Sequence, residues 1–183
     1  MKRFLLLALL ALPGCAALTP TQPAPGLPET VASVDLARYA GTWFEAARLP
    51  IFFQDGERVR CADVTAIYTA RPDGRIDVLN TCRNALQGGA IRSATAVATP
   101  VPGSGNARLR VAFFWPLHGD YWVIGLDPEY RWAVVGAPSR RVLWVLSRTP
   151  VMAEADYARA VDIARAQGFA VGNLRRTEQS VRN

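Results

Sequence analysis

The chain has 183 residues, of which half are hydrophobic and a fifth are charged, and this composition is typical of one globular domain with a core of ordinary size. The formal net charge is +6, and it falls by two, to +4, when Lys2 and Arg3 are removed with the leader expected below. Nearly all basic residues are arginines, and they are dispersed instead of forming blocks of like charge. This distribution argues against a nucleic-acid partner.

Residues 1–14 are predicted to be a signal peptide. A basic start precedes a short apolar run, 4–12, which is too short to span a bilayer as a permanent helix. The run ends in Leu12-Pro13-Gly14-Cys15, which resembles a bacterial lipobox, where cleavage precedes the cysteine and lipid is attached to it. We therefore expect a lipid anchor on Cys15, and Ala16 after it favours the outer membrane, with the protein facing the periplasm. A plain secretory signal with Cys15 as an incidental thiol is the alternative.

Residues 15–30 are rich in proline, threonine and glutamine and show no apolar period, a composition typical of an extended tether. The folded domain is expected over 31–175, with a C-terminal tail over 176–183. A short helical segment then leads to Gly41, where the chain can turn sharply, and Trp43 follows with a large apolar face.

After this turn the sequence is predicted to be all-β. Short apolar segments alternate with turn residues, and the expected strands are 43–49, 61–69, 76–82, 90–99, 108–113, 121–126, 131–136 and 142–147. Eight short strands in a meander predict an up-and-down antiparallel barrel. The apolar period then changes over 152–167, which predicts one C-terminal helix packed outside the barrel, ended by Gly168. A short final strand is expected over 169–171.

The three cysteines divide into Cys15 and a pair, Cys61 and Cys82, which flanks a predicted hairpin. An exported protein lies in a compartment where disulfides persist. We therefore expect a disulfide between Cys61 and Cys82 across two antiparallel strands. Two free thiols are the alternative, and they would leave Cys61 available for chemistry.

Three segments of the chain carry a family resemblance: Asp35-Leu36-Ala37-Arg38-Tyr39-Ala40-Gly41-Thr42-Trp43-Phe44-Glu45, Tyr121-Trp122-Val123-Ile124-Gly125-Leu126-Asp127-Pro128-Glu129-Tyr130 and Leu143-Trp144-Val145-Leu146-Ser147-Arg148-Thr149-Pro150. In this order and with a helix after them, they resemble the motifs of the lipocalin family, most closely those of bacterial outer-membrane lipocalins. The resemblance implies that Arg148 lies across the Trp43 indole at the closed end of the barrel, beside the turn at Gly41. These residues would form a structural floor.

An eight-stranded barrel has an interior just large enough for one small ligand. Alternation along each strand, counted from Arg148 or aligned with the second motif, places eight side chains on the inner face. They are Leu109, Val111, Phe113, Tyr121, Val123, Val142, Trp144 and Leu146. Such an apolar and aromatic wall with one phenol suits an acyl chain. The alternative is that these side chains fill a closed core.

The end opposite Trp43 is the expected mouth, formed by loops 50–60, 83–89, 115–119 and 138–140. The apolar residues there are candidates for touching a membrane or a second copy in a homodimer: Ile51, Phe52, Phe53 and Trp115. Nearby arginines favour a lipid with an anionic head, a fatty acid or a lysophospholipid, through charge-assisted hydrogen bonds: Arg58, Arg60, Arg83, Arg140 and Arg141.

The sequence offers few residues for catalysis. It has one histidine, His118, and neither metal-ligand spacing, a phosphate loop nor a dinucleotide fingerprint. We therefore expect no metal, no cofactor and no enzyme activity, but a lipid-binding lipoprotein that stores or transports fatty acids or lysophospholipids in the cell envelope. Two alternatives stay open. One is a thiol-dependent lipid isomerase that uses Cys61, as one lipocalin branch uses a cysteine near the start of strand two. The other is an envelope interaction protein with a filled barrel.

Overall fold

The computed structural model describes residues 26–114 and 117–180 of the chain. Its elements are α1 (Leu36–Tyr39), β1 (Gly41–Arg48), α2 (Phe52–Asp55), β2 (Cys61–Ala70), β3 (Ile76–Asn84), η1 (Ala85–Gln87), β4 (Ala90–Pro100), β5 (Arg108–Phe114), β6 (Leu117–Leu126), β7 (Trp132–Gly136), β8 (Leu143–Ser147), α3 (Glu154–Ala166), η2 (Val171–Asn173) and β9 (Arg175–Arg176). Among the described residues, no helix is both long enough and apolar enough to cross a membrane.

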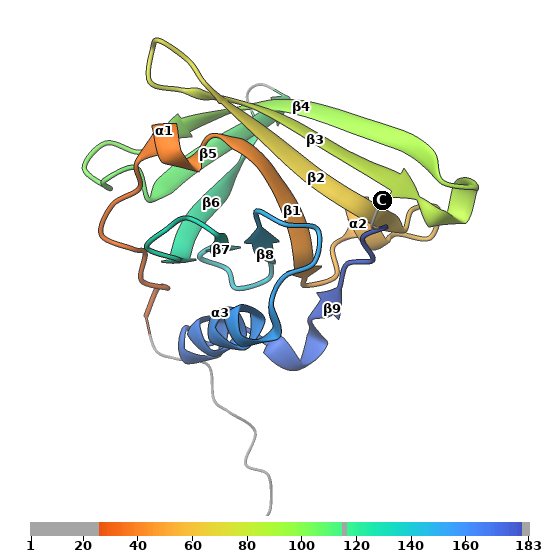
Figure 1. Ribbon diagram of the computed structural model, residues 1–183. Coiled ribbons are helices and arrows are strands. Elements are labelled where there is room, and N and C mark those ends of the chain that lie inside the picture. Colours follow the sequence, from red (N-terminus) through yellow and green to blue (C-terminus); the bar gives the residue numbers. More distant parts are fainter. Residues whose placement is uncertain (1–25, 115–116, 181–183) are drawn as a thin grey trace, which may run out of the picture.

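The strands form one closed antiparallel barrel (Figure 1). Strands β2 to β8 pair with their neighbours in the chain, and β1 pairs with both β8 and β2, which completes the closure. Each of the eight strands thus pairs with a neighbour on both sides, although β4 pairs with β5 only over 97–100. The predicted eight-stranded up-and-down barrel with a helix outside is confirmed, and β9 adds a short extra strand beside β1.

The connections alternate between the two ends of the barrel because the strands are antiparallel. The closed end carries α1 and the loops 71–75, 101–107 and 127–131. The open end carries 49–60, with α2 inside it, and the loops 85–89 and 137–142. We use the names closed end and open end in this sense below.

Alternation along the strands divides most of the buried side chains between two large clusters. On β7, Val135 belongs to the cluster inside the barrel together with Trp43. Its neighbour Val134 belongs to the cluster between the barrel wall and α3. Ala160 and Ala164 of α3 are fully buried in that outer cluster, and such small side chains allow the helix to lie close to the sheet. Helix α3 therefore covers one side of the barrel (Figure 1).

The C-terminal segment lies in the seam between β1 and β2. Strand β1 pairs with β2 over its first half and with β9 over its second half. After β9, Thr177 N donates to Ala46 O at 3.0 Å, and Asp63 N donates to Glu178 O at 2.8 Å. The described part of 176–183, expected to be a tail, is thus bound between two barrel strands.

Three local predictions differ from the structure. Loop 50–60 contains helix α2, where Asp55 accepts from Ile51 N at 3.2 Å and so closes the turn. Strand β6 begins at Leu117, so His118 is in a strand instead of a loop. The final strand is β9 instead of 169–171, because Phe169 turns inward against β7. Its ring fits only because Gly136 has no side chain, since a Cβ there would lie 2.5 Å from Phe169 Cζ.

Candidate functional site

The closed end is built around Trp43. Its side chain is fully buried, and its Nε1 donates to Tyr39 O at 2.8 Å. The guanidinium of Arg148 lies over the indole, with Cζ 3.7 Å from the ring centroid. Arg148 also donates to Thr42 O at 2.8 Å and to Arg38 O at 2.7 Å. Because its hydrogen bonds go to main-chain carbonyls, Arg148 ties β8 to the start of β1 and has a structural role.

Gly41 forms the sharp turn before Trp43. Its φ of +94° lies in the region that glycine adopts without strain. A Cβ at this position would lie 3.4 Å from Arg148 Nη1, which is close to ordinary contact, so the backbone conformation is what favours glycine here.

Three tyrosine hydroxyls meet inside the barrel beside this floor. Tyr121 OH lies 2.8 Å from Tyr39 OH and 3.0 Å from Tyr68 OH. Burial raises the pKa of Tyr68 to about 12 and holds the pKa of Tyr39 and of Tyr121 well above the usual value. These phenols therefore give the interior neutral hydrogen-bonding groups and no charge at physiological pH.

The structure places most of the predicted lining residues inside the barrel. Four are in the buried interior cluster, namely Leu109, Val111, Val123 and Leu146. Two more are partly buried and pack against that cluster, Tyr121 and Trp144. Val142 is partly buried in the open-end loop before β8. The Phe113 side chain and Trp115 lie outside the described part of the structure.

Burial of the inner face decreases toward the open end. On β4, Ala98 is 2% exposed and Ala96 is 7% exposed. By alternation Ala94 faces the same way, and it is exposed to solvent. Tyr121 and Trp144 also keep part of their surface accessible. The inner wall is thus closely packed near Trp43 and accessible nearer the open end.

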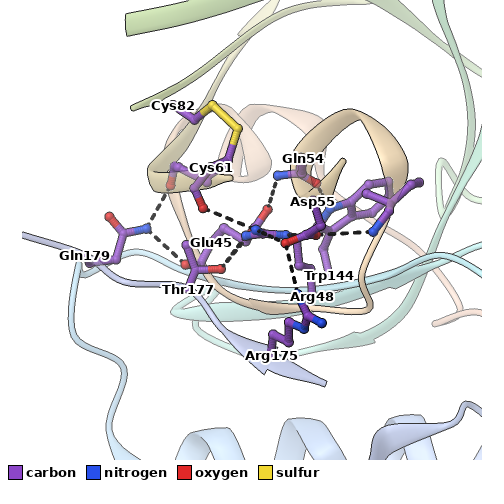
Figure 2. A network of polar contacts seen from close by, with 12 residues as sticks. Glu45, Arg48, Gln54, Asp55, Cys61, Cys82, Trp144, Arg175, Thr177 and Gln179 are labelled. Carbon is purple, nitrogen blue, oxygen red and sulfur yellow. Dashed lines mark hydrogen bonds and ion pairs between the residues drawn. A yellow bond between two sulfur atoms is a disulfide. The ribbon is translucent and has the colours of Figure 1, made fainter. Parts of the chain in front are cut away.

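A buried ionic network joins β1 to α2 at the open end (Figure 2). Arg48, 3% exposed, donates to both carboxylate oxygens of Asp55 at 2.7 Å each, and it also donates to Glu45. A further hydrogen bond of 3.2 Å joins Arg48 to Cys61 O on β2. Arg48 therefore bridges two carboxylates and ties three elements together, and Arg175 lies 3.8 Å from Asp55 as a second cation.

Gln54 of α2 connects this network to the inner wall. Its Nε2 donates to Glu45 Oε2 at 2.7 Å, and its Oε1 accepts from Trp144 Nε1 at 3.0 Å. Glu45 also accepts from Thr177 of the C-terminal segment, as Figure 2 shows. Helix α2 is therefore held against the interior face of β8 at the point where the wall becomes accessible.

The pKa of Asp55 depends on two opposing effects in this network, burial and the charge of Arg48. Burial acts to raise the pKa of the Asp55 carboxyl, but the Arg48 guanidinium outweighs burial, so the net pKa lies below the usual value. The same pairing outweighs burial at Arg48 and raises the pKa of its guanidinium. The ionised forms of both residues are the ones that the fold requires.

The geometry of barrel, floor and outer helix agrees with a comparison against protein families, in which the model of the lipocalin-like domain matches residues 34–179. The chain belongs to the lipocalin family. Similar proteins occur in plants and bacteria. The chain is 39% identical over 159 residues to temperature-induced lipocalin-1 of Arabidopsis thaliana, a match that covers 83% of each protein.

Two bacterial relatives of this lipocalin are named outer membrane lipoprotein Blc. Identity is 39% over 145 residues with the protein of Escherichia coli K12, covering 79% of this chain and 78% of the relative. Identity is 36% over 175 residues with the protein of Vibrio cholerae, and this match covers 93% of this chain and 94% of the relative. Among solved structures, insecticyanin of Manduca sexta has a TM-score of 0.65 at 16% identity, covering 88% of each chain. The likeness to insecticyanin shows the fold alone.

The lipocalin barrel contains the expected Cys61–Cys82 disulfide, which joins β2 to β3 across 21 positions of sequence. Both cysteines are buried and pack with Val64. The disulfide leaves no thiol on Cys61, so a thiol enzyme would lack its nucleophile in this oxidised form. Across residues 26–114 and 117–180, no group of three or more His, Cys, Asp or Glu side chains could hold a metal ion.

The arginines expected at the rim of this lipocalin face in different directions. Arg58 and Arg60 are exposed on the loop after α2. Arg83 lies 3.5 Å from the Asp63 carboxylate. Arg140 instead donates to the carbonyls of Gln167 and Gly26 at 2.7 and 2.9 Å, so its guanidinium faces α3 and the N-terminal segment.

Sequence reasoning missed several interior residues of the lipocalin barrel. They are Glu45, Gln54, Ala66, Tyr68, Ile76, Val78, Ala96 and Ala98. Two had a usable signal, because Tyr68 alternates with Ala66 on β2 and Glu45 stands two residues after Trp43 on β1. Gln54 had none, since its position depends on how α2 packs against β8.

The three hydrogen-bonded tyrosines give an alkaline titration that can be tested. Because the fold raises their pKa values, they stabilise it fully below the ordinary tyrosine pKa of about 10 and lose that effect as pH rises above it. At a pH of about 11, we expect the absorbance at 295 nm to be lower than ionisation of all five tyrosines would give. The missing part should appear only as near-UV circular dichroism is lost. Tyr121→Phe should shrink that delayed part, and ionisation of all tyrosines in folded protein at that pH would contradict the assignment.

Proposed function

We propose that this lipocalin is a lipid-binding lipoprotein that stores or transports fatty acids or lysophospholipids in the bacterial cell envelope. The observation that supports this function is the inner wall, which is apolar and buried near Trp43 and accessible beside Tyr121 and Trp144. An acyl chain matches such a wall, because apolar walls with few polar groups are typical of sites for hydrophobic ligands. Leu109, Val111, Phe113, Val123, Val142 and Leu146 would contact the chain along with Tyr121 and Trp144.

The cellular location follows from the N-terminus and from the relatives. Residues 1–14 have the features of a signal peptide, and Cys15 is the proposed site of lipid attachment. Cys15 lies outside the described residues, and two bacterial relatives are named outer membrane lipoproteins. We infer an outer-membrane protein that is anchored by lipid on Cys15 and faces the periplasm.

The head of the lipid is inferred from charge at the open end. Arg58 and Arg60 are exposed there, whereas the carboxylates of Glu45 and Asp55 are paired with Arg48, and Asp55 also lies 3.8 Å from Arg175. A carboxylate or phosphate at the open end would form charge-assisted hydrogen bonds with the exposed arginines. Fatty acids and lysophospholipids both combine such a head with one acyl chain.

A matched pair of substitutions tests acyl binding inside the barrel. Ala94→Phe places a ring on the inner face of β4, and Thr95→Phe places the same ring on the outer face one residue later. For delipidated protein titrated with a fluorescent fatty acid, we expect Ala94→Phe to weaken binding about tenfold or more, which is about 1.4 kcal/mol. Thr95→Phe should bind like the parent.

Two outcomes would count against the proposal. Delipidated parent protein that fails to bind the fatty acid would support a filled barrel, and equal weakening by both variants would place the ligand elsewhere.

The head-group inference has its own comparison. If a fatty acid and the neutral alcohol of the same chain length bind equally well, the exposed arginines do not select the ligand.

A further inference from the structure

Large apolar side chains are exposed together at the open end. Phe52 and Phe53 of α2 are 82% and 42% exposed, and their rings meet edge to face with centroids 5.3 Å apart. Leu86 of η1 is 47% exposed, and Ile91 at the start of β4 is 70% exposed. Grouped exposure of this kind marks a surface that contacts another apolar phase.

The backbone that carries these side chains is held by buried polar groups. Asn84 is fully buried, and it donates to Arg58 O at 2.9 Å and accepts from Arg60 N at 3.0 Å. Ala85 N also donates to Arg60 O at 2.8 Å. The α2 loop and the η1 loop therefore form one continuous surface, while Arg48 holds α2 in place through Asp55.

Positive charge surrounds these apolar side chains. Arg58 and Arg60 follow α2, Arg92 follows Ile91, and all three are exposed. Beside the open end, an open cleft of about 650 Å³ lies between Leu49 and Pro50, the 137–142 loop and residues 170–175. Its other lining residues include three arginines, Arg140, Arg141 and Arg175. Among the described residues of 49–60, 85–89 and 137–142, Glu57 is the exposed acid.

We propose that the open end is a docking surface for an anionic lipid bilayer. The apolar side chains of α2, η1 and β4 would enter the boundary between head groups and acyl chains, and the arginines around them would contact lipid phosphates. A negatively charged leaflet attracts basic residues that lie within a Debye length of it. A second copy of the chain would offer this basic surface no complementary charge.

The N-terminal segment meets the folded domain at the same end. Gly26 O accepts from Arg140 on the open-end loop between β7 and β8. The lipid anchor proposed above would be on Cys15, eleven residues earlier, and that length of chain reaches about 40 Å at most. The docking proposal does not depend on the anchor, but such an anchor would hold the open end near the membrane.

Vesicle binding without the anchor tests the docking surface. A chain that begins at Ala16 lacks Cys15 and keeps every described residue. We expect it to float with vesicles that contain phosphatidylglycerol and much less with vesicles of phosphatidylcholine alone. Phe52→Ser with Ile91→Ser should lower the partition about tenfold or more. Val151→Ser with Ile67→Ser, which removes exposed apolar side chains far from the open end, should not change it.

The electrostatic part has its own matched pair. Arg58→Gln with Arg60→Gln should lower the partition to anionic vesicles about tenfold. Added salt should lower the partition of the unsubstituted protein in the same way. Arg110→Gln with Arg159→Gln removes the same charge from exposed positions on β5 and α3 and should leave the partition unchanged. Thermal unfolding of each variant confirms that it is folded.

Three results would overturn the proposal. The first is an unsubstituted protein that does not bind anionic vesicles, and the second is an equal loss of vesicle binding in the test and control variants. The third is a sedimentation experiment in which Phe52→Ser with Ile91→Ser dissociates a dimer while vesicle binding persists. The last result would assign the surface to a second copy. Titration with a fluorescent fatty acid in the absence of vesicles is a separate readout, so failure of docking and failure of acyl binding are distinguishable.

Discussion

Trp43→Ala is expected to lower the free energy of unfolding by about 3–5 kcal/mol, the range for truncating a large buried aromatic side chain. The indole is fully buried, lies 5.0 Å from the Tyr39 ring between centroids, and is covered by Arg148. Its removal would leave a cavity, deprive Tyr39 O of a donor and remove the ring beneath the guanidinium. For a domain of this size, the melting temperature should fall by about 6–20 °C.

Chemical denaturation measures this loss, and Trp43→Phe is the control. Phenylalanine keeps a ring under Arg148 but cannot donate to Tyr39 O, so its cost should be smaller than that of alanine. Affinity for a fluorescent fatty acid, measured per folded molecule, should change less than stability does. An unchanged melting temperature together with lost lipid binding would instead place the ligand at the closed end.

Arg48→Ala is expected to lower the free energy of unfolding by about 3–5 kcal/mol, the cost of removing one partner from a buried ion pair. The substitution would leave the buried carboxylates of Glu45 and Asp55 without their closest cation, with the exposed Arg175 3.8 Å from Asp55 Oδ1. It would also remove the hydrogen bond that joins β1 to Cys61 O on β2. Urea denaturation at neutral pH measures the effect.

Neutralising the orphaned carboxylates should restore much of this stability. Arg48→Met combined with Glu45→Gln and Asp55→Asn keeps similar volumes without buried charge, and such replacements are often neutral. The pH dependence gives a second check. Because the folded pKa of Asp55 is lowered, its contribution is present above the ordinary value of about 4 and is lost as pH falls through the folded pKa. The gap between parent and Arg48→Ala should therefore narrow in acid. A cost below about 1 kcal/mol would mean that the pair behaves as an exposed one.

Much of the barrel could be predicted because its signals are local. Alternation of apolar residues, the turn at Pro72-Asp73-Gly74 and the change of period after Pro150 each depend on neighbouring positions only. The resemblance of the Gly-x-Trp segment and of the arginine after β8 to lipocalin motifs implied where the closed end lies. The inner position of Leu146 and Val111 followed from a period of two. Their contact with a ligand stays a prediction.

The sequence by itself determined the class of fold, the order of the strands and the cysteine pair across a hairpin, since these follow from short-range patterns. Only the tertiary structure decided that Gln54 reaches Trp144, 90 positions away, and that Thr177 reaches Glu45, 132 positions away. It also decided that Arg140 faces α3 while Arg58 stays exposed. The physical reason is that a charged or amide side chain takes whichever partner packing brings within about 3 Å, and no local pattern in the chain encodes that partner.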